Sequence, residues 1–143
     1  MAESNGRCCS SWVTIDFEEK ARENLSAARR LLPDDEGTID GLPNAAASRA
    51  YYAAYLAVAH RAQALVVPIS ASKDAYYRHD TLPDDAVRHG ILDDNGRRRL
   101  EHLRDLRVKP DYLEDHVDFE EADHAVAVAD DVVRSVLDSR GAP

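Results

Sequence analysis

Residues 44–67, NAAASRAYYAAYLAVAHRAQALVV, form an alanine-rich stretch between Pro43 and Pro68. Alanine is a strong helix former, and a helix tolerates proline in its first turn or ends before one. The stretch has two apolar faces at helical spacing, one with Tyr51, Tyr55, Val58, Ala62 and Leu65 and one with Ala46, Ala50, Ala53 and Ala57. A helix that is apolar on two sides packs between neighbours. We therefore expect this stretch to be the central helix of a bundle.

Local signals outside this stretch predict further helices. Asp16 and Asp118 each precede a glutamate by three positions, which is the spacing of a capping box at a helix start. Pro110 is expected to end the fourth helix. The five predicted helices span residues 17–32, 44–67, 83–89, 96–108 and 119–138. With no strand candidate between them, the sequence predicts an all-α antiparallel up-and-down helical bundle of four long helices plus one short helix.

The chain of 143 residues is expected to form one domain. Residues 1–13 predict a flexible tail, residues 14–138 the helical bundle, and residues 139–143 a frayed C-terminus. Cys8 and Cys9 are the only cysteines, and two adjacent thiols in a polar tail neither staple a fold nor complete a zinc site.

The composition is that of a soluble globular protein, with 44% hydrophobic and 31% charged residues. No apolar run approaches the length of a membrane span, and no secretory segment begins the chain, so we expect a cytoplasmic protein that does not associate with membranes. The sequence has no glycine-rich phosphate loop and no paired metal-ligand spacing, so we expect neither a cofactor nor a metal.

The charge is unevenly distributed along the chain. The net charge of −9 argues against indiscriminate nucleic-acid binding, which depends largely on basic groups. Residues 97–109, however, contain six basic residues against two acidic ones, a local charge of +4. This segment is either a site for a phosphate or acidic partner, or a solvated helix face neutralised by an acidic neighbour.

Arg107 stands out within the basic segment because of its position on the predicted helix. It follows Leu103 by four residues and Leu100 by seven, so it projects from the apolar stripe rather than from the outer face. A guanidinium there either pairs with a buried carboxylate, for which Asp111 is the candidate, or lines a cleft. Tyr112 and Asp111 are expected just beyond the helix end, close enough to share a site with it.

Two blocks of the sequence resemble one known family. SRAYYAAYLAVAHRAQAL, residues 48–65, is similar to the signature helix of the HEPN family, the higher eukaryotes and prokaryotes nucleotide-binding domain. LRDLRVKPDY, residues 103–112, resembles its second block, and the similarity runs over about residues 17–137. The small stand-alone prokaryotic HEPN proteins, several of them encoded beside a minimal nucleotidyltransferase, are the most similar type. The resemblance implies an α-helical bundle that forms a homodimer.

The resemblance also implies a chemistry. Many HEPN proteins are metal-independent endoribonucleases that use an arginine, followed four to six residues later by a histidine, at the dimer cleft. The family arginine maps to Arg107, but Tyr112 stands where the histidine is expected. A phenol, with an ordinary pKa of about 10, is a poor substitute for imidazole as a base near neutral pH. Arg107, with Tyr112 and Asp111 beside it, is the predicted catalytic group.

Other residues are candidates for binding RNA or another ligand. Arg104 and Lys109 share the basic segment with Arg107, and the pair Arg78-His79 lies in the connector before the short helix, where it is either a loop pair or folds over the Arg107 end of the bundle. One literal arginine–histidine motif runs from Arg97 to His102, but five positions turn two side chains about 140° apart on a helix. His60 is expected to be structural.

Two functions remain open at the level of sequence. The first is a HEPN-like dimeric module associated with nucleotides or nucleic acids, the partner of a nucleotidyltransferase in a toxin–antitoxin or defence system. The second is a metal-independent endoribonuclease, an RNA-cleaving toxin that uses Arg107 at a dimer cleft. The missing histidine and the net charge of −9 favour the first.

Overall fold

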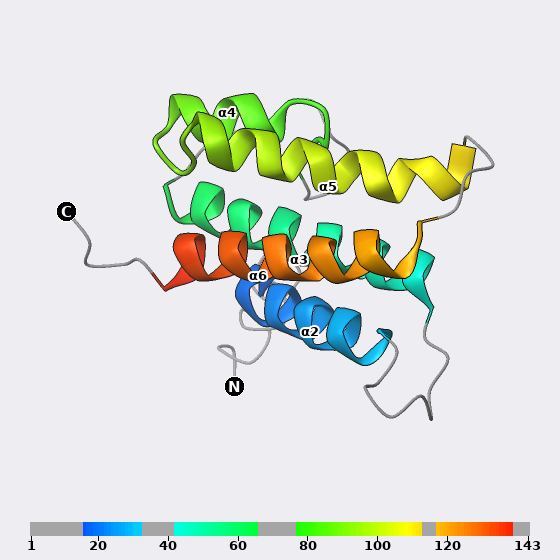
Figure 1. The fold of residues 1–143 in the computed structure, drawn as a ribbon. Helices are drawn as coiled ribbons and strands as arrows, with labels where there is room; N and C mark the ends of the chain where they lie inside the picture. The colour runs from blue at the N-terminus through cyan, green and yellow to red at the C-terminus, as the bar shows by residue number, and fades with distance from the viewer. Residues whose placement is uncertain (1–15, 33–41, 66–76, 113–116, 139–143) are drawn as a thin grey trace, which may run out of the picture.

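The computed structural model describes residues 16–32, 42–65, 77–112 and 117–138. Five helices make up most of these residues, α2 Phe17–Arg30, α3 Pro43–Ala64, α4 Leu82–Arg88, α5 Asp94–Tyr112 and α6 Phe119–Leu137 (Figure 1). The described residues contain no strand, so the predicted all-α class and the division into four long helices and one short helix are confirmed.

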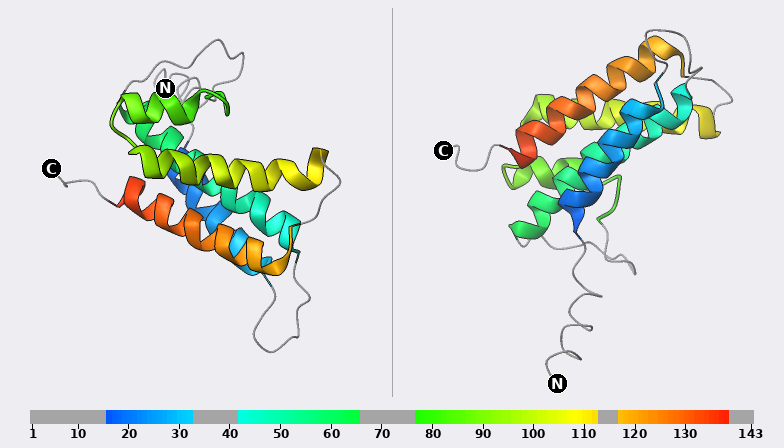
Figure 2. Two further views of the ribbon diagram at one scale, coloured as in Figure 1. Left: turned by 45° about the horizontal axis from the view of Figure 1, so that its top comes forward. Right: turned by 90° about the horizontal axis from the view of Figure 1, so that it is seen from below.

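α3 lies at the centre of the bundle and packs against every other described helix. α2 lies on one side of α3 and α4 and α5 on the other, while α6 runs alongside α3 and also contacts α2 and α5 (Figures 1 and 2). The long helices alternate in direction, α2 and α5 running one way and α3 and α6 the other. This is the antiparallel up-and-down arrangement that the sequence predicts.

Both apolar faces of α3 are buried within the same chain. The alanine ridge at Ala46, Ala50, Ala53 and Ala57 is fully buried, because small side chains let neighbouring helices approach closely, and Tyr51, Tyr55, Val58 and Ala62 of the other face are buried as well. Leu65 is 47% exposed, since α3 ends at Ala64 and the stripe ends with it. The two faces therefore build the core of one chain.

The predicted helix starts at both ends of the bundle are present. The Asp16 carboxylate accepts a hydrogen bond from the Glu19 backbone N–H at 2.9 Å and caps α2. At α6, Asp118 accepts from the Glu121 N–H at 2.8 Å while the Glu121 side chain accepts from the Asp118 N–H at 3.1 Å, which completes a capping box. Such caps stabilise a helix by about 1 kcal/mol each.

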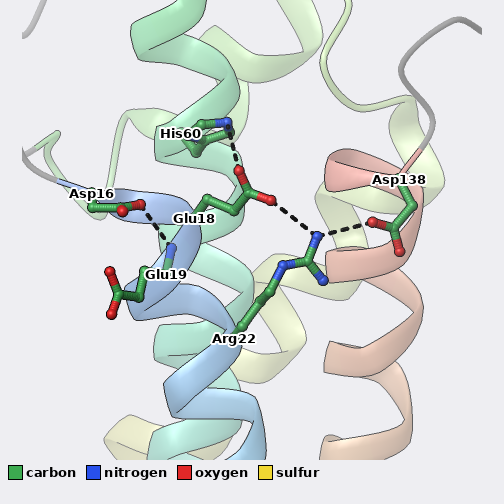
Figure 3. A network of polar contacts seen from close by, with 6 residues as sticks. All are labelled: Asp16, Glu18, Glu19, Arg22, His60 and Asp138. Carbon is green, nitrogen blue, oxygen red and sulfur yellow. Dashed lines mark hydrogen bonds and ion pairs between the residues drawn. The ribbon is translucent and has the colours of Figure 1, made fainter.

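Arg22 of α2 joins three helices at one end of the bundle (Figure 3). Its guanidinium lies 3.1 Å from Glu18 of the same helix and 3.0 Å from Asp138, the residue that follows α6. The Glu18 carboxylate also lies 3.8 Å from Nε2 of His60 on α3. His60 thus lies at the edge of a network of exposed ion pairs, and its structural role stays a prediction.

α5 is longer than predicted and includes Pro110. It begins at Asp94 and continues to Tyr112, so the predictions that Pro110 ends the helix and that Asp111 and Tyr112 lie beyond it are wrong. Proline removes one backbone N–H, but its fixed φ is itself helical, and in a last turn only that one hydrogen bond is lost. Residues 109–112 are described as helical backbone, without their side chains.

Several predictions concern residues outside the described part of the chain. The tail over residues 1–13, with Cys8 and Cys9, and the C-terminal residues 139–143 both lie there. None of the described helices is long and apolar enough to cross a membrane.

Candidate functional site

Three tyrosines of α3 and one histidine from the segment before α4 form an aromatic cluster. The His79 ring stacks on Tyr55, with ring centroids 4.2 Å apart and planes 22° apart. Tyr51 lies 5.5 Å from the same imidazole, and Tyr52 meets it edge-on at 5.9 Å. Tyr51 and Tyr55 are one helical turn apart, so their rings present a single face to His79.

Hydrogen bonds fix this histidine against the helix. The Tyr51 hydroxyl forms a short hydrogen bond with Nδ1 of His79, and the Tyr55 hydroxyl donates to the backbone carbonyl of Tyr77. A buried tyrosine hydroxyl needs a polar partner, and both find one in the segment that leads to α4. The half-buried imidazole is therefore held by stacking and by one nitrogen, which leaves Nε2 as the other polar atom of the ring.

Arg107 of α5 lies over the same tyrosines. Its guanidinium carbon is 5.0 Å from the ring centroid of Tyr52 and 5.9 Å from that of Tyr51, within the range of a cation–π contact. Arg104 precedes it by three residues and therefore lies on the same side of α5. Among the described side chains, no carboxylate comes within 4.0 Å of either guanidinium, the distance that defines an ion pair.

The surroundings keep His79 and Tyr51 uncharged. Burial lowers the pKa of His79 below its ordinary value of 6.5, and the positive charges of Arg107 and Arg104 lower it further. Asp80 opposes this with a smaller effect. Burial raises the pKa of the Tyr51 phenol well above its usual range. At neutral pH the site thus contains a neutral imidazole, a neutral phenol and two guanidinium cations.

A pocket of about 680 Å³ opens beside this cluster, between α2, α3, α5 and the segment before α4. It is lined by Lys20, Glu23, Asn24, Tyr52, Tyr55, Leu56, Tyr77, Arg78, His79, Asp80 and Arg104. Arg78 donates to both carboxylate oxygens of Asp80, at 3.1 and 2.9 Å. The lining combines aromatic faces with cations, and within the described residues no three His, Cys, Asp or Glu side chains gather as a metal site requires.

The structure brings together four of the residues singled out from the sequence. Arg104, Arg107 and His79 surround the tyrosine cluster, and Arg78 lines the same pocket while engaged by Asp80. Their roles in binding or catalysis stay predictions. The side chains of Lys109, Asp111 and Tyr112 lie outside the described part of the chain. The ion pair between Arg107 and Asp111 therefore stays a prediction.

The remainder of the basic segment faces elsewhere. Arg97 forms an ion pair with Asp84 of α4 at 3.2 Å, which ties α5 to the short helix. His102 lies on the side that faces α6, where its ring meets that of His124 with centroids 6.0 Å apart. The literal motif from Arg97 to His102 is therefore divided between two surfaces of α5, as helical geometry predicts, and does not form one site.

The tyrosines are the part of the site that sequence reasoning missed, since the sequence pattern assigned Tyr51 and Tyr55 to the core and gave Tyr52 no role. Tyr51 and Tyr55 are indeed buried, but their hydroxyls point to the segment before α4, and Tyr52 is half-buried beside them. A signal was present in the sequence, because three tyrosines within five positions carry three hydroxyls that need polar partners. The partner of the Tyr51 hydroxyl is His79, twenty-eight positions further along the chain, and no pattern in the sequence indicated that these two residues meet.

A comparison with family models finds one match, to a family described as HEPN domain, over residues 16–139. No curated protein and no solved structure matches the chain. The matched residues include all five described helices and every residue of the pocket.

Proposed function

Since the chain belongs to the HEPN domain family, we propose that the pocket beside Arg104 and Arg107 binds the phosphates of RNA or of a nucleotide. At the level of the family, the domain is a module associated with nucleotides or RNA. The proposal assigns that association to a particular surface of this chain, the one formed by α3, α5 and residues 77–80.

The observation that carries the proposal is the pair of guanidinium groups on one side of α5. Arg104 and Arg107 lie within about one helical turn of each other and have no carboxylate partner among the described side chains. Guanidinium groups bind phosphate oxygens through paired N–H donors, and such charge-assisted bonds are about twice as strong as neutral ones. In a chain with a net charge of −9, two cations without an acidic partner favour a local anion site.

The aromatic part of the pocket supports a nucleic-acid ligand over a simple anion. Tyr52 is half-buried, and its ring borders the pocket between the Arg107 guanidinium and the His79 edge. Stacking of a base on an aromatic side chain is worth about 1–3 kcal/mol and tolerates any base. The pocket volume of about 680 Å³ lies within the range of small-molecule sites.

The test is binding of a fluorescently labelled single-stranded RNA of mixed sequence, followed by anisotropy. Arg104→Gln and Arg107→Gln should each weaken binding about ten- to a hundredfold, since a hydrogen bond to a charged group contributes about 1.5–3 kcal/mol. Each should also reduce the dependence of log K on log salt by about one. The matched control is Arg98→Gln, an exposed arginine of the same helix outside the pocket. Equal affinity of all three variants and the wild type would refute the proposal.

We also propose that the protein is a homodimer and that a nucleotidyltransferase is its partner in a toxin–antitoxin or defence system. HEPN domains commonly dimerise and bind RNA. The support for the specific partner is the resemblance to the small stand-alone proteins encoded beside such enzymes. Where a nucleotidyltransferase is encoded beside this protein, co-purification of the two tests the proposal, and their failure to associate when co-expressed would contradict it.

A further inference from the structure

The pocket has a second wall, formed by α2, whose chemistry differs from that of α5. α5 contributes the Arg104 guanidinium, whereas α2 contributes the Glu23 carboxylate and the Asn24 amide in addition to Lys20. We infer that the α2 wall reads the base of the bound ligand and that the pocket selects guanine. The inference rests on the proposed function, because it requires the phosphate of RNA or of a nucleotide to bind beside Arg104 and Arg107.

Glu23 is the acid of the pocket whose carboxylate no described cation engages. Two acids line the pocket, and the carboxylate of the other, Asp80, accepts hydrogen bonds from Arg78 through both of its oxygens. Among the described side chains no cation lies within 4.0 Å of the Glu23 carboxylate, although Lys20 is one turn away on the same helix. Glu23 therefore offers a ligand two acceptor oxygens and no donor.

Asn24 is half-buried, and its amide is fixed in one orientation. The amide nitrogen Nδ2 donates to the backbone carbonyl of Lys20 at 2.8 Å, and Oδ1 accepts from the Arg49 guanidinium at 3.2 Å. The reverse orientation would set acceptor against acceptor at one end and donor against donor at the other. These bonds use one of the two N–H groups of the amide. The α2 wall therefore provides one oriented N–H donor together with the two carboxylate oxygens.

Guanine is the base whose Watson–Crick edge complements these groups. It carries two adjacent donors, N1–H and the N2 amine, next to the acceptor O6. The donors match the two oxygens of Glu23, and O6 matches the N–H of Asn24. Adenine and cytosine place the lone pair of a ring nitrogen beside their exocyclic amine, so one carboxylate oxygen would face a lone pair. Uracil offers a single N–H between two carbonyls. Bases of single-stranded RNA expose this edge to proteins.

The remaining features of the pocket give such a ligand one orientation. The acid on α2 repels phosphate and the guanidinium groups on α5 attract it, so the phosphate binds toward α5 and the base toward α2. Between them, the half-buried ring of Tyr52 borders the pocket from α3 and offers a stacking surface. An unpaired glutamate is common on a chain with a net charge of −9. Its place in one cavity with an oriented amide, an aromatic ring and an unpaired arginine is what points to a base.

The test uses short, labelled single-stranded RNAs of uridine that carry one guanosine, inosine or adenosine at the centre, and it follows binding by anisotropy. Wild type should bind the guanosine RNA about ten- to a hundredfold more tightly than the adenosine RNA, the discrimination that a bidentate contact to a base edge provides. Inosine lacks the N2 amine but keeps N1–H and O6, so its RNA should lie between the two. Unlabelled guanosine and adenosine monophosphates, added as competitors, show whether a free nucleotide is sufficient.

Two variants separate the groups that read the base. Glu23→Ala should make the affinities for the guanosine and inosine RNAs equal within about twofold, because the amine that distinguishes these bases contacts Glu23. Asn24→Leu should weaken both by about tenfold and keep the difference between them, because both bases have O6.

The control is Glu19→Ala, which changes an exposed glutamate one turn earlier on α2 and outside the pocket. Loss of a negative charge strengthens the binding of any RNA, so the ratio of two affinities is the quantity compared. Glu19→Ala removes the same charge as Glu23→Ala and should leave the ratio of guanosine to inosine affinity as in wild type. Circular dichroism should show that every variant is folded.

Two results would overturn the inference and leave the phosphate-binding proposal intact. The first is equal affinity of the wild type for the guanosine and adenosine RNAs. The second is a preference for guanosine that Glu23→Ala leaves unchanged, which would mean that Glu23 only adds negative charge to the pocket. The phosphate-binding proposal fails separately, if Arg104→Gln and Arg107→Gln bind each of these RNAs as wild type does.

Discussion

Arg22 and Arg107 are both arginines that join helices, yet their surroundings differ. Arg22 lies between the carboxylates of Glu18 and Asp138, at 3.1 and 3.0 Å, in a network with roughly half of each side chain exposed. Arg107 lies over the faces of Tyr51 and Tyr52 and has no carboxylate partner among the described side chains. The first cation is neutralised by its own chain, whereas the second retains the charge that an anionic ligand would neutralise.

The difference shows why the number of basic residues is a poor guide to function in this protein. Exposed ion pairs such as those of Arg22 contribute only about 0–1 kcal/mol to stability, and they leave little charge to attract a ligand. Arg97 is a second example, because Asp84 neutralises it although it belongs to the basic segment. What distinguishes Arg104 and Arg107 is a neighbouring surface of aromatic rings, with no described carboxylate at ion-pair distance.

The difference between the two arginines should disappear if Arg107 is given an acidic neighbour like those of Arg22. Tyr52→Glu should weaken RNA binding by more than about 100-fold, because it removes a stacking surface worth about 1–3 kcal/mol and adds a charge that repels phosphate. The folded state should persist, since Tyr52 is half-buried and at the edge of the core. Anisotropy and thermal melting are the two measurements.

The reverse change is the matched control. Glu18→Gln combined with Asp138→Asn frees Arg22 of both carboxylates, but no aromatic contact of Arg22 is found among the described residues. RNA affinity should therefore change by less than about twofold at physiological salt, where an isolated exposed charge is largely screened. A large gain in this variant would show that any unpaired arginine on this protein binds RNA.

The elements that the sequence predicted well depend on residues close together in the chain. Asp118 and Glu121 form their capping box because three positions bring them into contact at a helix start, wherever that helix packs. The central position of α3 follows in the same way from its alanines and tyrosines, and so does the inward projection of Arg107. The bundle could thus be predicted from periodicity and caps.

The site could be predicted only in part, because it depends on distant contacts. His79 meets Tyr51 across a connector that has no helical or strand periodicity, so nothing in the local sequence fixed where that segment returns. The prediction that Pro110 ends α5 was wrong for a different reason. A proline usually ends a helix, but in a last turn only one hydrogen bond is lost, and α5 continues to Tyr112.

The interface of the proposed homodimer offers another way to compare the two arginines, because it would show whether Arg22 or Arg107 lies near the second copy of the chain. Light scattering after size exclusion should give about twice the chain mass of 15.9 kDa. If the Arg107 end forms the shared cleft, Arg107→Glu should lower the dimer fraction and Arg22→Glu should not. A monomer at tens of micromolar would contradict the dimer and the shared cleft together.

The smallest expected effect is a pH dependence of stability that only the Arg107 region should show. The pKa of His79 is lowered in the folded protein, mainly by burial and then by Arg107 and Arg104. The unfolded chain therefore binds a proton at this histidine near pH 6.5, before the folded protein does. Stability from the neutral imidazole is complete above that pH and is lost as the pH falls from 6.5 through the lower pKa of the folded state.

Melting temperatures of wild type and His79→Asn between neutral and mildly acidic pH measure this contribution, because the carboxylates that titrate in the same range are common to both proteins. The wild type should lose more stability than His79→Asn over this interval, and the two should run parallel above it. His60→Asn is the control from the Arg22 network, where the imidazole lies 3.8 Å from Glu18. His60 belongs to that network and does not lie beside Arg104 or Arg107, so replacing it should not reduce the loss of stability at acidic pH. If His60→Asn reduced that loss as much as His79→Asn does, the loss could not be assigned to the burial of His79 beside Arg107 and Arg104.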